Sequence, residues 1–449
     1  MIDRKKIIFL LVPILLFNCS FDNKTGLWKG EEKERKRISE LEKRQKQIIT
    51  IDKVYTSDNI YTKEVSLKKK IILSNPKKVI SWEISGLNNQ NFLGNIYSSG
   101  IDYIFFKKKI GKDKFSISKN KTSLLFHKNN IIFSDDTGTI FSLYETGKIN
   151  WKKNIYKKIY KKVYKNLTFS IYKNIIYVAD NIGFVYAIDS SSGKLVWIKN
   201  HGTPIKSDVK IYENKVFLID HDNRIFSLNT KDGTKVWQIL SISSFIKSQS
   251  LLSLAVTKTG DLIAINSSAD LFKINCEKGN IYWSSNTSDT LFANETDFFK
   301  SSNVVIDNDQ IIFSAGSSMF SYNIINGIKN WEKEVTSIAT PIIDRENIFI
   351  VTDNGYFVIL EKNTGQIINS TNILKVLKKK RRNTKITNFI MGSGKIYAMT
   401  LNGFLIVSSA TSGNVVSFKK IGDTVSSSPV INNGNLYILT EGSKIIGFQ

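Results

Sequence analysis

The clearest pattern of apolar and polar positions lies in residues 175–197, which read as three short strands joined by two tight turns. Residues 175–179 and 184–188 are β-branched and aromatic runs, and the turns after them contain Gly183 and Gly193. Such runs favour strands, and glycine favours turns that need a positive φ. A unit of this size has an apolar face that it cannot bury alone. The pattern therefore predicts neighbouring units of the same kind.

These neighbours form a repeat along most of the chain. The glycine before the last strand recurs at intervals of 46, 40, 46, 48, 38 and 48 residues, a period typical of a four-stranded propeller blade. The positions are Gly147, Gly193, Gly233, Gly279, Gly327, Gly365 and Gly413. Four residues later the chain has Trp151, Trp197, Trp237, Trp283 and Trp331, then Asn369 and Ser417 in the last two repeats. Seven copies in register predict a radial β array.

The two ends of this array predict how a ring closes. Three apolar runs between residues 428 and 448 supply three strands of a last blade, which leaves its outer strand to come from elsewhere. Residues 77–82, which end in Trp82, are the candidate for that strand. We therefore predict an all-β protein, an eight-bladed β-propeller of four-stranded antiparallel blades over residues 77–449. Residues 79–82 are expected to pair with residues 444–448, so that no edge stays exposed.

The repeat, written D/N-x-G-x-(apolar)-(aromatic)-x-(Leu/Ile)-(Asp/Asn)-x-x-x-Gly-x-x-x-Trp, resembles the pyrroloquinoline-quinone-type propeller repeat. Over roughly residues 77–449 the chain resembles the BamB family, lipoproteins of the outer-membrane β-barrel assembly machinery. The resemblance implies a non-catalytic periplasmic scaffold that assists insertion of outer-membrane proteins. The partners that it implies are the barrel-forming subunit, BamA, and unfolded outer-membrane proteins, with no nucleic acid. Enzymes and scaffolds share this repeat, so it specifies the fold more closely than the function.

The resemblance also implies a docking surface. In the BamB family, the contact with BamA uses loops between the central blades that carry a Leu-x-Leu-Arg segment and an Asp-x-Asp segment. The first corresponds here to residues 244–247, which keep an apolar residue and a cation, and the second to residues 298–300. The implied partner-binding residues are Phe245, Ile246, Lys247, Asp297, Phe298 and Lys300. Of the two Asp residues of the Asp-x-Asp segment only Asp297 is present, and it lies one position before the segment. The acidic part of the docking surface has therefore changed, and the charge pattern expected of the partner changes with it.

The N-terminal residues predict export and a lipid anchor. Residues 4–6 include two lysines and an arginine, and residues 7–17 form an apolar core that is too short to span a bilayer. The segment Leu16-Phe17-Asn18-Cys19 resembles a bacterial lipobox, although Asn18 stands where Gly or Ala is usual. We therefore expect residues 1–18 to be a signal peptide and Cys19 to carry palmitate-type acyl chains, at the periplasmic face of the outer membrane. The alternative is an unmodified cysteine beside an ordinary cleavage site.

Residues 19–76 are expected to form a charged tether. Residues 31–47 are dense in Glu, Lys and Arg at helical spacing, which fits a solvated spacer or a partner-binding helix. The second cysteine, Cys276, has no partner if Cys19 is acylated, so we expect no intramolecular disulfide.

The net charge of +25 follows from heavy use of lysine throughout the chain. An exported chain meets no nucleic acid in its normal place, so this charge does not indicate nucleic-acid binding. Residues 156–165, where Tyr and Lys alternate, and residues 378–382, a run of three lysines and two arginines, exceed the background. Both are expected in connections between blades, as solvated loops or as contacts with anionic lipid or an acidic partner.

The residues of a catalytic site are missing. Quinone-dependent dehydrogenases of this repeat hold their cofactor against a Trp and a vicinal Cys-Cys disulfide, and no Cys-Cys occurs here. The three histidines (His127, His201 and His221) are scattered, and no Gly-x-Ser-x-Gly segment is present. We expect no catalytic, cofactor or metal site. A degenerate quinoprotein dehydrogenase and a polysaccharide- or peptidoglycan-binding module remain as alternatives to the scaffold.

Overall fold

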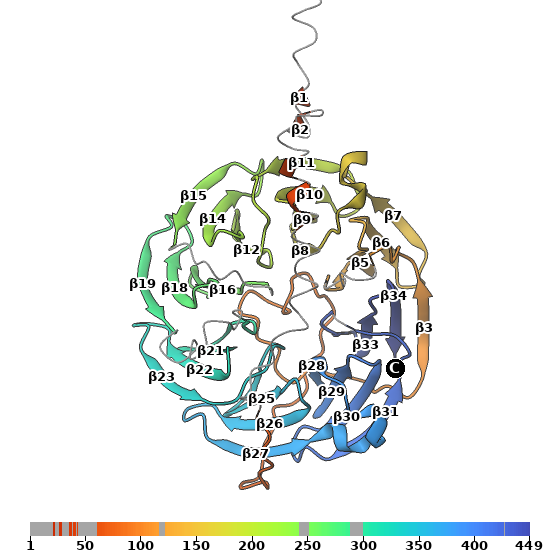
Figure 1. Cartoon of the computed structure of the whole chain (residues 1–449), viewed down its shortest axis with the longest axis vertical. Coiled ribbons are helices and arrows are strands. Elements are labelled where there is room, and N and C mark those ends of the chain that lie inside the picture. The colour runs from red at the N-terminus through yellow and green to blue at the C-terminus, as the bar shows by residue number, and fades with distance from the viewer. Residues whose placement is uncertain are drawn as a thin grey trace, which may run out of the picture.

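A computed structural model describes residues 61–115, 122–241, 251–287, 300–425 and 427–449, together with residues 21–22, 27–28, 36–37, 39–41 and 43. Within these residues, eight four-stranded antiparallel sheets are arranged as the blades of a ring (Figure 1). The predicted all-β, eight-bladed β-propeller is therefore confirmed.

Blades I to IV are each formed by consecutive strands, with the first strand nearest the centre and the fourth at the rim (Figure 1). Blade I contains β4 (Leu125–His127), β5 (Asn130–Ser134), β6 (Ile140–Tyr144) and β7 (Ile149–Lys153). Blade II contains β8 (Leu167–Tyr172), β9 (Ile175–Asp180), β10 (Phe184–Asp189) and β11 (Leu195–Asn200). Blade III contains β12 (Lys210–Tyr212), β13 (Lys215–Ile219), β14 (Arg224–Asn229) and β15 (Lys235–Leu240). Blade IV contains β16 (Leu254–Val256), β17 (Asp261–Ile265), β18 (Asp270–Asn275) and β19 (Ile281–Asn286).

Blades V to VII follow the same order, and blade VIII is composite. Blade V contains β20 (Val305–Asp307), β21 (Gln310–Ala315), β22 (Ser318–Asn323) and β23 (Lys329–Lys333). Blade VI contains β24 (Ile342–Asp344), β25 (Asn347–Val351), β26 (Tyr356–Glu361) and β27 (Ile367–Asn372). Blade VII contains β28 (Ile386–Gly392), β29 (Lys395–Thr400), β30 (Phe404–Ser409) and β31 (Val415–Lys420). Blade VIII contains β32 (Val430–Asn432), β33 (Asn435–Leu439), β34 (Lys444–Phe448) and β3 (Ile104–Lys109). Outside the blades lie the short strands β1 (Phe21–Asp22) and β2 (Leu27–Trp28) and the 3-10 helices η1 (Lys158–Lys162), η3 (Ile373–Val376) and η4 (Lys379–Arg381).

The antiparallel order of the strands gives the ring two different faces, because successive strands are joined alternately at the two ends of a sheet. The hairpin face carries the turns between the first and second strands and between the third and fourth strands of each blade. The connection face carries the turns between the second and third strands and the links from each blade to the next. These links run over the surface and can vary in sequence, so the connection face is a natural place for recognition.

The repeated tryptophan and glycine form the contact between neighbouring blades. In the first five repeats the indole Nε1 donates a hydrogen bond of 2.8–3.2 Å to a carbonyl in the next blade. The glycine leaves room for the ring, since a Cβ added to Gly279, whose φ is +76°, would lie 2.7 Å from Trp237. In the sixth repeat, the Asn369 side-chain amide takes the place of the indole and donates to Ser412 O at 3.3 Å. The repeated tryptophans therefore pack neighbouring blades together.

The ring closes through a different strand from the predicted one. The outer strand of blade VIII is β3, which pairs antiparallel with β34. The prediction that residues 79–82 pair with residues 444–448 is therefore wrong, although an N-terminal strand does complete the last blade. Phe106 of β3 lies against Gly147 of blade I, as the tryptophans lie against the later glycines. Because a phenylalanine fills this position, the outer strand needs no tryptophan.

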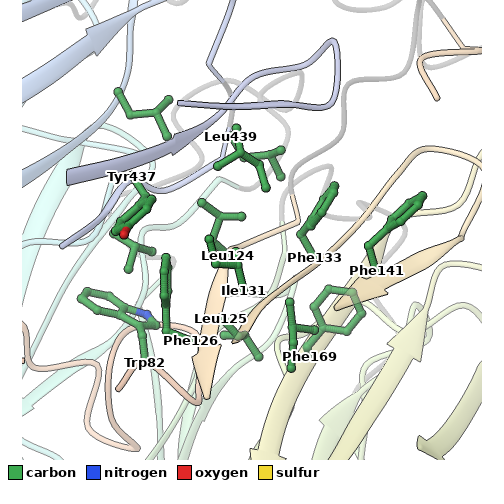
Figure 2. Packing of buried hydrophobic residues seen from close by; sticks show 14 of the residues in the cluster. Trp82, Leu124, Leu125, Phe126, Ile131, Phe133, Phe141, Phe169, Tyr437 and Leu439 are labelled. Carbon is green, nitrogen blue, oxygen red and sulfur yellow. The ribbon is translucent and has the colours of Figure 1, made fainter. Parts of the chain in front are cut away.

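Trp82 lies instead at the inner side of blade I. Its backbone exchanges two hydrogen bonds with Phe126 of β4, with N···O distances of 2.8 and 2.9 Å. Its side chain is buried, and Figure 2 shows it beside Phe126. The Phe126 ring centroid lies 4.6 Å from that of Tyr437 in blade VIII. Trp82 therefore belongs to the apolar cluster that joins the first and last blades.

Residues 61–103 form a continuous segment, here called the strap, that bonds to all eight blades. It begins beside β27, where Val65 exchanges two backbone hydrogen bonds with Ser370 and covers the outer edge of blade VI. It then crosses the centre of the ring, where Figure 1 draws it in orange. Its further hydrogen bonds join Trp82 to Phe126, Glu83 to Ile171, Asn89 to Ile211 and Val256, Gln90 to Ile306, Ser74 to Asp344, Ile96 to Ser393, and Ser99 to Gly434. Residues 61–76, which the sequence assigned to the tether, are thus part of the strap.

After its start beside blade VI, the strap lies at the hairpin face. Its bonds to Ser393 and Gly434 fall on the turns between the first and second strands of blades VII and VIII. Its bonds to Val256 and Ile306 fall near the ends of β16 and β20 that lead into the same kind of turn. The strap therefore occupies the centre of the hairpin face.

A buried lysine fixes the strap to the ring. Lys210 of β12 is fully buried, and its Nζ donates to three oxygens of the strap at 2.6–3.3 Å, one of which is Oδ1 of Asn91. Asn91 is buried as well, and its Nδ2 donates to Leu254 O at 2.9 Å and Val304 O at 2.8 Å. Burial lowers the pKa of Lys210 to about 8, and the negative charge of Asp208 opposes this shift. One turn of the strap is thus held against blades III, IV and V.

Candidate docking face

The two loops that the resemblance assigns to partner binding are links of the connection face. Residues 242–250 join blade III to blade IV, and residues 288–299 join blade IV to blade V. Five of the expected contact residues lie outside the described residues: Phe245, Ile246, Lys247, Asp297 and Phe298. The structure places the sixth, Lys300, at the start of the segment that leads into blade V.

The described ends of both loops bond to one turn, residues 266–269 between β17 and β18. Ser241, which precedes the first loop, accepts a hydrogen bond from Asn266 Nδ2 at 3.0 Å. Thr287, which precedes the second loop, donates to Ala269 O from its backbone N at 3.0 Å and from Oγ1 at 2.9 Å. Both loops therefore leave the ring beside the same turn of blade IV. The sequence did not reveal this anchoring, because single side-chain hydrogen bonds to a turn have no periodic pattern.

The flanks of these loops expose one apolar side chain and one cation. Leu240, the last residue of β15, is 73% exposed. Lys300 is exposed, and its carbonyl accepts a hydrogen bond from Gly316 N at 3.0 Å, which fixes its backbone beside the turn between β21 and β22. Burial raises the pKa of Asp353 in blade VI, and the positive charges of Lys385 and Lys300 oppose that shift. Leu240 precedes the first loop and Lys300 follows the second, so the two exposed side chains lie on opposite sides of blade IV.

The stretch 156–165 is divided between the core and the surface. Tyr160, Val163, Tyr164 and Lys165 are buried, whereas Lys158, Ile159, Lys161 and Lys162 are exposed. Tyr156 donates a 2.5 Å hydrogen bond to the buried Asp180 carboxylate, which itself accepts three backbone N–H groups of its own turn. The aromatic residues thus hold η1 firmly on the ring while the lysines face outward.

The run 378–382 is also partly engaged. The Arg382 guanidinium donates to Leu377 O at 2.8 Å and Lys375 O at 2.7 Å, and the Arg381 guanidinium lies 5.5 Å from the centroid of the Phe404 ring. Lys378 and Lys379 are exposed. Neither basic stretch is simply a solvated loop, because each has residues that bind it to the blades.

The histidines and the free cysteine of the described residues lie apart from one another and bond or pack locally. No three His, Cys, Asp or Glu side chains come together there in a way that could hold a metal ion. Nδ1 of His127 lies 2.7 Å from Glu83 Oε1 of the strap. His201 packs against Phe226 with centroids 5.1 Å apart, and its burial, helped by nearby cations, lowers its pKa to about 4. Burial raises the pKa of the Cys276 thiol to about 12.

Two pockets, of about 510 and 480 Å³, adjoin the strap at the hairpin face. Charges in the first are paired, with Lys273 Nζ 3.3 Å from Asp261 and Lys362 Nζ 3.0 Å from the Asp307 carboxylate. Neither pocket is lined by a tryptophan or a cysteine, the side chains against which quinone-dependent dehydrogenases hold their cofactor. Among the described residues, no helix is long and apolar enough to cross a membrane.

Eight radial blades, with tryptophan–glycine contacts at five of their junctions, define the class of the protein as a propeller of the pyrroloquinoline-quinone-type repeat. The crystal structure of BamB from Moraxella catarrhalis is similar, with a TM-score of 0.65 and 13% identity, over 77% of this chain and 99% of that one. A europium-containing methanol dehydrogenase reaches a TM-score of 0.63 with 9% identity, over 80% of this chain and 89% of that one. The quinohemoprotein alcohol dehydrogenase of Comamonas testosteroni reaches a TM-score of 0.62 with 10% identity, over 82% of this chain and 80% of that one. At such low sequence identities the similarity shows a shared fold alone, and the similar structures include enzymes.

The family described as Outer membrane protein assembly factor BamB matches residues 136–371, just over half of the chain. The chain therefore belongs to the BamB family. A curated relative, the outer membrane protein assembly factor BamB of Moranella endobia (strain PCIT), is 24% identical over 293 residues. That match covers 63% of this chain and 63% of the relative, slightly less than two thirds of its length.

Proposed function

We propose that this chain is a non-catalytic scaffold in the assembly of outer-membrane proteins, which docks through its connection face on the barrel-forming subunit, BamA. Membership of the BamB family supports the assembly role. The observation that carries the docking site is the turn at residues 266–269, which bonds to the described ends of both expected docking loops. Because Ser241 and Thr287 bond to the same turn, the two loops can contribute to one contact, and a rigid blade beneath them would limit the entropy lost on binding.

The scaffold hypothesis fits the blades better than a degenerate dehydrogenase does. The repeated tryptophans are packed between blades and donate to backbone carbonyls, so their rings are not offered as a platform for a cofactor. Unfolded outer-membrane chains are the second partner class of this proposal. A dehydrogenase or a polysaccharide-binding module would instead require a ligand pocket with dedicated aromatic or metal-binding residues.

The proposed location is the periplasmic face of the outer membrane, with acyl chains on Cys19 as the anchor. Several acyl chains hold a protein on a membrane stably, at about 0.8 kcal/mol for each buried CH₂. Cys19→Ala should therefore either leave the signal peptide uncleaved, which changes the electrophoretic mobility, or give a soluble protein that is lost from the detergent-phase fraction. An unchanged membrane fraction and unchanged electrophoretic mobility would contradict the lipid anchor, since Asn18 would then have abolished the signal.

The docking proposal is tested with Ile246→Asp combined with Lys247→Glu. An apolar anchor beside a charge typically carries about 2 kcal/mol or more of binding free energy, which corresponds to a loss of about 30-fold or more in affinity. We expect recovery of the barrel-forming subunit in a pull-down from detergent-solubilised membranes to fall accordingly. Circular dichroism should confirm that the ring stays folded, because the substitutions lie in a link outside the blades.

The matched control is Lys379→Glu combined with Lys380→Glu, in the link between blades VI and VII. This pair changes more charge but lies far around the ring from blade IV, so the pull-down should be nearly unaffected (Figure 1). Unchanged recovery with the Ile246/Lys247 variant, in a protein that is folded, would contradict the assignment of the docking residues.

A further inference from the structure

A cluster of exposed lysines lies on the connection face, away from the proposed docking loops. It spans two neighbouring links, the one that leads into blade I and the one from blade I to blade II. Its members are Lys112, Lys114, Lys158, Lys161 and Lys162, here called the first basic cluster. A hydrogen bond of 2.7 Å from Lys114 Nζ to Lys161 O joins the two links. The five lysines therefore form one surface.

The first basic cluster exposes five lysines and one carboxylate, that of Asp113. Asp113 is exposed within it, but Asp135 and Asp136 are buried and accept backbone N–H groups of the same link. Turns of the hairpin face differ, since they expose one carboxylate for each lysine, as at residues 231–232 and 277–278. The positive charge of the cluster thus exceeds the lysine-rich background of the chain.

One apolar side chain stands among these lysines. Ile159 of η1 is 36% exposed, between Lys158 and Lys161, while the neighbouring Tyr160 is buried in the ring. An exposed isoleucine surrounded by lysines suits the boundary between lipid headgroups and acyl chains. There the apolar side chain inserts, and the long lysine side chains reach the phosphates.

A second basic cluster lies on the same face but at another part of the ring. It consists of the exposed Lys378, Lys379 and Arg381 in the link between blades VI and VII. Asn402, in the turn between β29 and β30, donates to Arg381 O at 3.1 Å and holds this link on the connection face. A planar anionic surface can touch both clusters at once, whereas a short acidic peptide segment would reach only one of them.

The described N-terminal helix residues reach the ring at this face as well. The Arg37 guanidinium donates to Ile182 O in the turn between β9 and β10, and Leu41 packs against the apolar core. Arg37 therefore lies at the connection face, beside the link from blade I to blade II.

We propose that the connection face docks on an anionic lipid surface through the two basic clusters and Ile159. The proposed docking loops flank blade IV, whereas the first basic cluster flanks blade I and the second lies between blades VI and VII, so the two contacts use different links of the connection face (Figure 1). Each lysine near an anionic leaflet strengthens binding about fivefold, and the attraction is screened by salt. This contact is independent of whether BamA is the partner.

The test is vesicle flotation of the full chain carrying Cys19→Ser, which removes the expected acylation site. Vesicles of phosphatidylcholine alone report the part of binding that comes from the apolar residues 7–17. Vesicles containing a quarter phosphatidylglycerol add the electrostatic part. We divide the partition coefficient for the vesicles with phosphatidylglycerol by that for the vesicles of phosphatidylcholine alone. We expect this ratio to be well above one at low salt and to approach one at 0.5 M salt. Lys158→Gln, Lys161→Gln and Lys162→Gln together should lower that ratio about 100-fold.

The matched control neutralises three exposed lysines of hairpin-face turns, by Lys194→Gln, Lys231→Gln and Lys278→Gln. It removes the same net charge and should leave the ratio nearly unchanged. No preference for anionic vesicles, or an equal loss in the control variant, would overturn the proposal. Binding to polyglutamate that depends on the first basic cluster, together with vesicle binding that does not, would also overturn it in favour of an acidic protein partner.

Discussion

Asn91→Ala tests whether the strap is held by the polar contacts that the structure shows. The side chain of Asn91 is 1% exposed and bonds to two carbonyls and to the Lys210 ammonium. A hydrogen bond between neutral groups contributes about 1 kcal/mol, and one to a charged group contributes about 2 kcal/mol. Asn91 also has a φ of +56°, a conformation that alanine tolerates less well by about 1 kcal/mol. The expected loss is therefore about 4 to 5 kcal/mol in the free energy of unfolding.

This loss converts into a measurable shift of the melting temperature. With an unfolding entropy of ~2 cal/mol/K per residue over the roughly 370 described residues, the total is ~0.8 kcal/mol/K. Calorimetry of the full chain should then show Tm lowered by about 5 to 6 °C. Limited proteolysis with a lysine-specific protease should cut the strap sooner, because it contains Lys68, Lys69 and Lys70 beside its attachment to blade VI.

Asn154→Ala is the matched control. The Asn154 side chain also makes three hydrogen bonds. Its Nδ2 donates to Thr137 O at 3.2 Å and Thr139 Oγ1 at 3.0 Å, and its Oδ1 accepts from Tyr156 N at 2.9 Å, but it is exposed, so water replaces them. We expect a shift of about 1 °C there. Equal shifts in the two variants, or an unchanged Tm with Asn91→Ala, would refute the account of the strap as a buried tie between blades.

Two further outcomes follow from the blade contacts and from one buried histidine. Gly279→Ala should lower the free energy of unfolding by about 2 to 4 kcal/mol, because the added Cβ would lie 2.7 Å from Trp237. Gly202 has a similar positive φ but open space around it, so the control Gly202→Ala should lower that free energy by only about 1 to 2 kcal/mol. Urea unfolding of both variants measures the difference, and equal costs would contradict the tryptophan–glycine contact. The pKa of His201 is about 4 in the folded protein and 6.5 in an unfolded chain. Its neutral form therefore contributes fully to stability above pH 6.5, and about 3 kcal/mol of the free energy of unfolding is lost as the pH falls toward 4. His201→Gln should remove that part of the pH dependence, and an unchanged slope between pH 7 and pH 4 would contradict its neutral burial.

The sequence predicted the fold where the packing is periodic. Each blade needs alternating apolar residues and a glycine in register, so the repeat from Gly147 to Gly413 predicts both the number and the order of the internal blades. The closing strand was assigned wrongly because Trp82 matched the repeat, whereas the position takes Phe106. Either aromatic ring fits over the glycine of the next blade, so residue type alone does not identify the outer strand.

The strap could not be predicted from the sequence, since its ties are isolated polar contacts between distant residues. Asn91 and Lys210 lie far apart in the chain, and neither belongs to a periodic pattern. The docking residues follow from the resemblance alone and stay a prediction, and the sequence did not indicate that Ser241 and Thr287 bond to the same turn. Such contacts depend on which links the ring brings together, and that arrangement exists only once the blades have folded.

The most direct test of the scaffold function is affinity purification of the wild-type protein from detergent-solubilised membranes, with the co-eluting proteins identified and quantified by mass spectrometry. We predict that the barrel-forming subunit of the outer-membrane assembly machinery co-elutes in near-equal molar amount, and that the Ile246→Asp/Lys247→Glu variant recovers far less of it. Recovery of the protein without that subunit, or with a bound quinone visible in its absorption spectrum, would contradict the account.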